Sequence, residues 1–291
     1  MIGRLLPALA VALPVALTAQ SPQQPVFRAS VAAVSVAVSV RKGNTPVAGL
    51  TSADFELFDN GVAQDIRAFS IEALPIDVTL LLHVSRSIAG HRLEWLKSSV
   101  VETAGRLRPG DRLRLIAVQH ALRELAGFQT GRGRPALEEV TALGGTSLID
   151  GLAAAMMRSS EADRRHLVVA FTTGVDTISA LRLETAEAIA ALADAVVHVV
   201  VPISGSGGVR RSAIADAAPL GTLVGRTGGQ LFWTDLDAPL AGAFAQALDE
   251  FRTSYVLRYV PAGVDRSGWH DITVRVKGGP YEVRARKGYG Q

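Results

Sequence analysis

The apolar run from Ile76 to Leu82 predicts a β-strand buried on both faces, because six of its seven residues are apolar or β-branched. A short polar segment, 83–87, follows it, and helical periodicity continues from about Gly90 to Arg106. Strand, polar loop and helix form the first unit of an open α/β sheet, and such sheets place their sites at the carboxyl ends of strands. We therefore expect segment 83–87 to contribute to a functional site.

The same strand–helix alternation continues to about residue 252. Further strands are predicted at 112–118, 166–171, 196–201 and 230–233, and residues 121–128 are expected to pair with the first of these as an edge hairpin. Helices are predicted at 135–142, 144–157, 181–194 and 238–251, with another ending near 224 after a loop at 204–208. Crossovers of helical length predict a mainly parallel sheet between two helix layers over 76–252.

Both ends of the chain have the period-two pattern of antiparallel strands. The N-terminal strands are predicted at 27–40, 55–58 and 64–71, with a helical turn near Ser52 and a hairpin turn at Asn60-Gly61. The C-terminal strands are predicted at 254–260, 272–276 and 281–287. Because chain ends often lie close together, we expect segments 27–72 and 254–291 to form a small antiparallel β-sandwich, with the α/β domain inserted between them.

The first nineteen residues have the pattern of a secretory signal peptide. Arg4 precedes an apolar stretch, 5–17, that contains two prolines, and small residues allow cleavage after Ala19. An uncleaved membrane anchor is the alternative, but the stretch is short for a span. We expect export to the periplasm or the cell exterior, a polar leader at 20–26, and no integral membrane span after cleavage.

Composition and charge exclude several functional classes. The 291 residues are 48% hydrophobic and carry a formal net charge of +3, with lysines and arginines scattered and not clustered. Nucleic-acid binding therefore has little support. The chain has no cysteine, which excludes disulfides and thiolate metal sites.

Motifs of the common enzyme classes are also missing. The sequence has no Gly-x-Ser-x-Gly and no His-Glu-x-x-His, and its six histidines show no ligand spacing. The glycine-rich segment 205–208 follows a strand, but it lacks the spacing of a dinucleotide-binding loop and the Lys-Ser/Thr of a phosphate-binding loop. We therefore expect a protein that is not an enzyme and that has no catalytic residues.

Landmarks along the chain resemble, in order, those of bacterial VWFA-related proteins of the acidobacterial type, which contain a von Willebrand factor A (vWA) domain. The matching segments are 50–61, 76–87, 107–111, 144–146, 172–177, 254–257 and 286–289. Each segment alone is weak evidence, but together they cover almost the whole mature chain. The resemblance implies a Rossmann-like vWA domain and an exported protein.

In vWA domains an Asp-x-Ser-x-Ser loop supplies the first ligands of a metal-ion-dependent adhesion site, which usually holds Mg²⁺. By this resemblance Ser85 and Ser87 match the two serines, and Thr146 matches the threonine of the second loop. His83 and Thr173 stand at the two positions where the family has a carboxylate. Because Mg²⁺ sites depend on hard oxygen ligands and carboxylate charge, we expect Mg²⁺ binding to be lost or very weak, and no cofactor.

Several other roles remain open for these loops. Asp176 or Asp150 can be considered as a substitute carboxylate, although Asp176 lies three residues past the usual position and is expected to cap the following segment. Zn²⁺ at His83 would have fewer strong ligands than usual, so a hydrogen-bonded histidine at a strand end is the simpler interpretation. A sharper hypothesis is that His83, Arg86 and nearby helix N-termini bind a partner's carboxylate directly.

The sequence as a whole indicates an exported, non-enzymatic vWA-type module with a degenerate and metal-free adhesion site. We expect it to bind a protein partner through Ser85, Arg86, Ser87 and Thr146. The first alternative is a structural scaffold that acts through its β-sandwich, with an inert top face. A cryptic hydrolase is the third interpretation.

Overall fold

The computed structural model describes residues 33–43, 45–71, 74–130, 137–157, 161, 164–203, 208–235 and 239–290. The predicted signal peptide (1–19), the leader (20–26) and the start of the first predicted strand lie outside these residues. Among the helices described, none combines the length and the apolar character that a membrane crossing needs.

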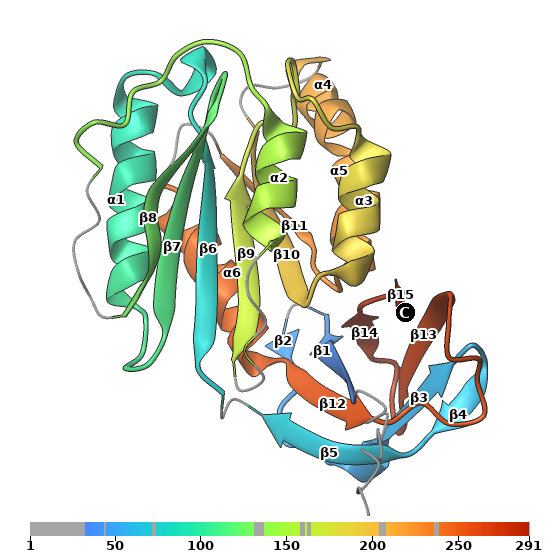
Figure 1. The fold of residues 1–291 in the computed structure, drawn as a ribbon. Coiled ribbons are helices and arrows are strands. Elements are labelled where there is room, and N and C mark those ends of the chain that lie inside the picture. The colour runs from blue at the N-terminus through green and yellow to red at the C-terminus, as the bar shows by residue number, and fades with distance from the viewer. Residues whose placement is uncertain are drawn as a thin grey trace, which may run out of the picture. The chain divides into compact units, whose positions relative to one another are not determined.

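A six-stranded sheet forms the centre of the α/β part, which confirms the predicted mixed α/β class (Figure 1). In sheet order the strands are β11 (Leu231–Asp235), β10 (Ala195–Ile203), β9 (Arg165–Phe171), β6 (Ile76–His83), β7 (Arg112–Val118) and β8 (Leu122–Thr130). The first five of these are parallel, and β8 runs antiparallel to β7 at one edge, as the hairpin pattern predicted.

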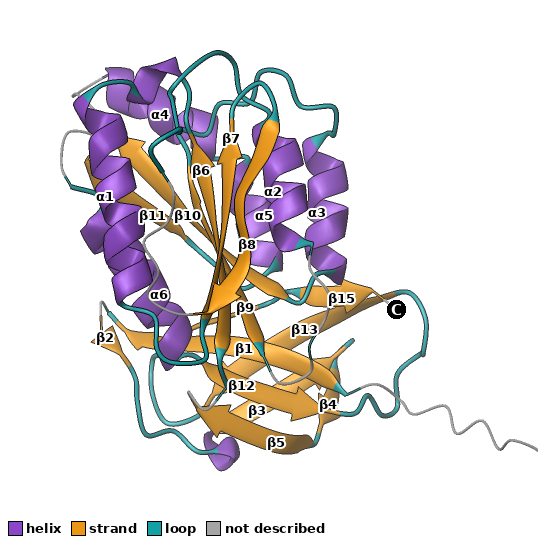
Figure 2. Cartoon of the chain, turned by 60° about the vertical axis from the view of Figure 1, so that its left-hand side comes forward, coloured by secondary structure: helices purple, strands orange, loops and turns teal. Residues whose placement is uncertain are grey.

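Helices cover both faces of this sheet (Figure 2). Every residue of β6 is buried, and its side chains alternate between the two faces, so that Leu80 and Leu82 join one apolar core while Leu81 joins the other. The first core includes α1 (His91–Gly105) and α6 (Ala241–Thr253). The second includes α2 (Leu148–Met156), α3 (Leu183–Leu192), α5 (Leu220–Arg226) and the end of α4 (Gly208–Ala217).

Strands from both chain ends form two antiparallel sheets that share a third apolar core. In the first sheet, β1 (Val34–Lys42) lies between β12 (Tyr255–Tyr259) and β14 (Glu282–Ala285). The other strands of that sheet are β2 (Thr45–Pro46) and β5 (Ile66–Ile71), and the second sheet contains β15 (Gly288–Gly290), β13 (Trp269–Val276), β3 (Phe55–Asp59) and β4 (Val62–Gln64). Each sheet mixes N-terminal and C-terminal strands, which is why the two distant segments pack together.

Local turn chemistry was predicted well in the N-terminal part. The helical turn is the 3₁₀ segment η1 (Ser52–Asp54), and Asn60 and Gly61 both have positive φ, at 46° and 79°, in the β3–β4 hairpin.

Two predicted helices differ from what the structure contains. The helix expected at 135–142 is wrong, since the described residues 137–142 contain one turn, at 138–139, and no helix; Leu137 and Val140 are both buried, so a single turn already satisfies their apolar spacing. The helix expected to end near 224 is two helices, α4 and α5, with Pro219 between them.

Glu250 of α6 ties the strand β1 to the α/β part. Its buried carboxylate accepts hydrogen bonds from Arg41 at 2.5 Å and Ser39 at 3.0 Å on β1, and from Arg284 at 3.3 Å on β14. It also accepts from Gln230 at 3.0 Å, just before β11. One carboxylate therefore links both antiparallel strands to the helix layer.

Candidate functional site

The strand order of the parallel sheet has a reversal that marks a site. Numbered along the chain, its six strands lie in the order 3-2-1-4-5-6, and the order reverses between β6 and β9. Open α/β sheets bind ligands in the crevice outside the carboxyl ends of the strands at such a reversal. His83 is the last residue of β6 and Thr172 directly follows β9, so both lie at this position.

The imidazole of His83 lies between two threonine hydroxyls. Its Nε2 is 2.6 Å from Oγ1 of Thr146, and its Nδ1 is 3.0 Å from Oγ1 of Thr172. His83 is only 1% exposed, and burial lowers its pKa to about 4 while the nearby charge of Asp176 opposes the shift. The ring is therefore neutral at pH 7, donating to one hydroxyl and accepting from the other.

The first loop continues from His83 with a pair of serines. Oγ of Ser85 and Oγ of Ser87 lie 2.9 Å apart and hydrogen-bond to each other. Ser85 is buried and precedes the 3₁₀ segment η2 (Arg86–Ile88), which is anchored by the buried Ile88. Arg86 and Ser87 are exposed, so the outer rim of this loop is cationic and polar.

The second loop (residues 143–147) and the third loop (residues 172–179) are joined through Thr146. Its carbonyl oxygen accepts from the backbone N–H of Thr177 at 2.9 Å and of Ile178 at 3.1 Å, and its own N–H donates to Oγ1 of Thr177 at 2.7 Å. Gly174 lets the third loop turn: its φ is +89°, and a Cβ there would lie 2.8 Å from the backbone of Ala217. These contacts fix the threonine hydroxyls around the imidazole.

The two carboxylates considered as substitute ligands are occupied by hydrogen bonds to the backbone or to a serine. Asp176 accepts from the N–H of Ile149 at 3.3 Å and from Oγ of Ser179 at 2.5 Å. Asp176 therefore contacts both the N-terminus of α2, which precedes it, and Ser179 of the segment that follows it; the hydroxyl of Ser179 accepts from the same N–H of Ile149 at 3.0 Å. Asp150 accepts from two backbone N–H groups directly after the third loop, at residues 180 and 181. Among the described residues, no group of three His, Asp or Glu side chains is placed to hold a metal ion.

Most of the predicted site residues gather at this edge of the sheet, and the structure adds one more, Thr172. His83 and Thr146 are in direct contact, and Ser85, Arg86 and Ser87 follow on the first loop. Thr172, directly before Thr173 on the third loop, also reaches His83 through its hydroxyl; Thr173 keeps its place as the position where the family has a carboxylate. Thr172 was identifiable as the first residue after the buried strand, where side chains reach the crevice.

Comparisons with known proteins give matches in structure only. No protein-family model matches the chain, and no curated protein matches it in sequence. A von Willebrand factor type A structure from Catenulispora acidiphila is 13% identical, with 80% of this chain and 71% of that chain covered and a TM-score of 0.49. The SpRpn10 VWA domain is 14% identical (60% and 94% covered, TM-score 0.41). An aerotolerance-related membrane protein from Bacteroides fragilis is 15% identical (60% and 98% covered, TM-score 0.47).

Matches as distant as these carry no argument about activity. By its own features the α/β part is a doubly wound, Rossmann-like sheet: it has the 3-2-1-4-5-6 strand order, the antiparallel edge strand β8, and a serine-containing loop after the first sheet strand.

Proposed function

We propose that this chain is an exported, non-enzymatic module that binds a protein partner through the top face of its vWA-type domain, without a metal ion. The top face is defined here as the loops 83–88, 143–147 and 172–179. The proposal rests on one observation, the neutral imidazole of His83 held between the hydroxyls of Thr146 and Thr172.

The donor set of the top face does not fit Mg²⁺. Magnesium binds through hard oxygen ligands with at least one carboxylate to offset the cost of dehydration. Here an imidazole stands at the first position, and the hydroxyl of Thr146, 2.6 Å from its Nε2, is committed to it. The nearby carboxylate of Asp176 accepts hydrogen bonds from Ser179 and from the N–H of Ile149. Three hydroxyls without a carboxylate bind a divalent ion weakly.

The exposed rim of the top face suits a protein partner. Leu143, Val175 and Ile178 are 55%, 40% and 49% exposed on the second and third loops. Arg86 is exposed on the first loop and offers a bidentate contact to a carboxylate. Apolar side chains grouped with a cation are typical of interaction surfaces, because apolar burial supplies affinity and the charge supplies orientation.

Chemical crosslinking followed by capture from envelope extract tests this proposal. The wild-type chain is expected to recover the same partner with and without EDTA, because no metal takes part. Arg86→Glu and Ile178→Asp are expected to lose that partner, whereas Lys287→Glu, an exposed change in the β part, is expected to retain it.

Three results would oppose the proposal. Loss of capture in EDTA would show that a metal is required, and loss in Lys287→Glu alone would favour the scaffold role of the β part. A hydrolase activity that disappears in His83→Asn would show that the site is catalytic.

A further inference from the structure

Two neighbouring methionines at the end of α2 have opposite environments. Met156 is the last residue of the helix and is 2% exposed in the second apolar core, whereas Met157 directly follows it and is 63% exposed. Among the large apolar residues that the structure describes, only Leu192 is more exposed, at 70%. The same thioether chemistry is therefore shielded at one position and open to solvent at the next.

Hydrogen bonds from the sheet hold the backbone of Met157 in place. Nη1 of Arg114 on β7 donates to the carbonyl oxygen of Met157 at 3.0 Å and to that of Ala154 at 3.2 Å. Nη2 of the same guanidinium donates to the carboxylate of Glu124 on β8 at 2.9 Å. Because these bonds satisfy carbonyl groups at the end of α2, the exposure of Met157 belongs to the folded helix end and does not result from fraying.

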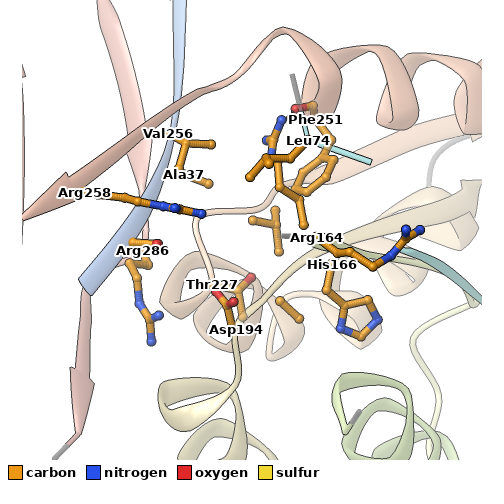
Figure 3. A pocket seen from close by; sticks show the side chains of 14 residues that line it. Ala37, Leu74, Arg164, His166, Asp194, Thr227, Phe251, Val256, Arg258 and Arg286 are labelled. Carbon is orange, nitrogen blue, oxygen red and sulfur yellow. Dashed lines mark hydrogen bonds between the residues drawn. The ribbon is translucent and has the colours of Figure 1, made fainter. Parts of the chain in front are cut away.

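Met157 lines an open groove of about 490 Å³ between the ends of α2 and α3. The residues described along this groove are mostly apolar, namely Met156, Met157, Ile189, Leu192 and Ala193. The polar ones, His166 and Asp194, also line a smaller cavity of about 70 Å³ (Figure 3). Met157 and Leu192 are the most exposed members of the apolar set, so a chemical change at Met157 alters the polarity of the groove's outer edge.

The thioether of a methionine reacts with hydrogen peroxide to give a sulfoxide. A sulfur lone pair attacks one peroxide oxygen, so that an S–O bond forms as the O–O bond breaks. The other oxygen leaves as hydroxide and takes up the proton of the transferred oxygen, which gives water. Sulfur is oxidised, the peroxide is reduced, and a flexible apolar side chain becomes polar.

We propose that Met157 is a selective oxidation site, at which hydrogen peroxide converts the apolar edge of this groove into a polar one. Met156 is protected by its burial, and methionine sulfoxide reductases reverse the change at Met157. The site is independent of the proposed top-face function, because it lies at the carboxyl end of α2 whereas the second loop precedes the amino end.

Brief treatment of the folded full chain with dilute hydrogen peroxide tests the selectivity, with fragmentation mass spectrometry of the peptide that contains both methionines. Met157 is expected to oxidise about tenfold or more faster than Met156, because burial limits access of the peroxide. In urea the two are expected to oxidise at similar rates, since the fold is the source of the difference. Equal rates in the folded chain, or the same preference in urea, would overturn the proposal.

Hydrophobic-interaction chromatography tests the change in polarity. The peroxide-treated wild type is expected to elute earlier than the untreated chain, and treatment with a methionine sulfoxide reductase is expected to restore its retention. Met157→Leu keeps an apolar edge without a thioether and is expected to lose this shift, whereas Met156→Leu is the matched control and is expected to keep it. Met1, the remaining methionine, is common to all variants and cancels in the comparison. A shift in Met157→Leu as large as that of the wild type would refute the role of this side chain.

Discussion

The buried neutral imidazole of His83 makes the stability of the fold sensitive to acid. Its pKa is about 4 in the folded protein, against 6.5 for an ordinary histidine, because burial disfavours the charged form. As the pH falls below 6.5 the unfolded chain takes up a proton at this position, and the folded chain does not until the pH approaches 4. Stability is therefore complete above pH 6.5 and is lost as the pH falls through this window.

The size of the effect follows from the shift. A shift of this size corresponds to about 3 kcal/mol in total, of which about 2 kcal/mol is lost between pH 7 and pH 5. His198 is also buried, and its pKa is lowered to about 3, so it adds a loss in the same direction. That second loss is common to every variant with an intact His198, and it cancels in a comparison between them.

Urea unfolding at pH 7 and pH 5 measures this dependence. We expect His83→Asn to lose about 2 kcal/mol less stability than the wild type between these two pH values, whatever its stability at pH 7. His120→Asn, which changes an exposed histidine, is the control and is expected to match the wild type. If His83→Asn shows the full wild-type decrease, the buried neutral imidazole is not the source and the argument fails.

Two further predictions concern buried carboxylates that bind side chains of the β part. Glu250→Gln is expected to lower the free energy of unfolding in urea by about 3 kcal/mol, because Arg41 and Arg284 lose their compensating charge. The control is Glu282→Gln, which changes a half-exposed partner of Arg284 and is expected to lower it by less than about 1 kcal/mol. Asp59→Asn is expected to lower stability by about 1–3 kcal/mol, since Asp59 accepts from His270 and two tyrosine hydroxyls; an unchanged thermal midpoint would contradict this.

Hydrophobic periodicity along the chain was enough to predict the central architecture. The uninterrupted apolar character of β6 and the alternation of strands and helices after it determine a layered α/β sheet. The Asn60-Gly61 turn was predictable because both residues tolerate positive φ.

Tertiary contacts decided the elements that the pattern did not predict. The segment 137–142 has helical spacing of Leu137 and Val140, but a hydrogen bond from the N–H of Leu143 to the carbonyl oxygen of Val84 holds the chain against the first loop. The strand β15 has three residues, and it exists because it pairs with β13. Such pairings depend on distant residues and leave no local signal.

The sequence predicted which residues belong to the candidate site, but it did not predict the hydrogen bonds between them. His83 and Thr146 were identified from their place in the family's loops, yet their hydrogen bond and the part played by Thr172 depend on how β6 and β9 lie side by side. The role of Asp176 depends likewise on the position of α2, which brings the N–H of Ile149 to its carboxylate.

Calorimetric titration of Mg²⁺ and Zn²⁺ into the wild type, His83→Asn and His83→Asp tests the central claim most directly. The account predicts no saturable binding at millimolar metal in the wild type or in His83→Asn, because neither places a carboxylate beside the hydroxyls. It predicts a Mg²⁺ site in His83→Asp, because this change restores a carboxylate beside the hydroxyls. Micromolar Mg²⁺ binding by the wild type that disappears in Ser85→Ala would contradict it.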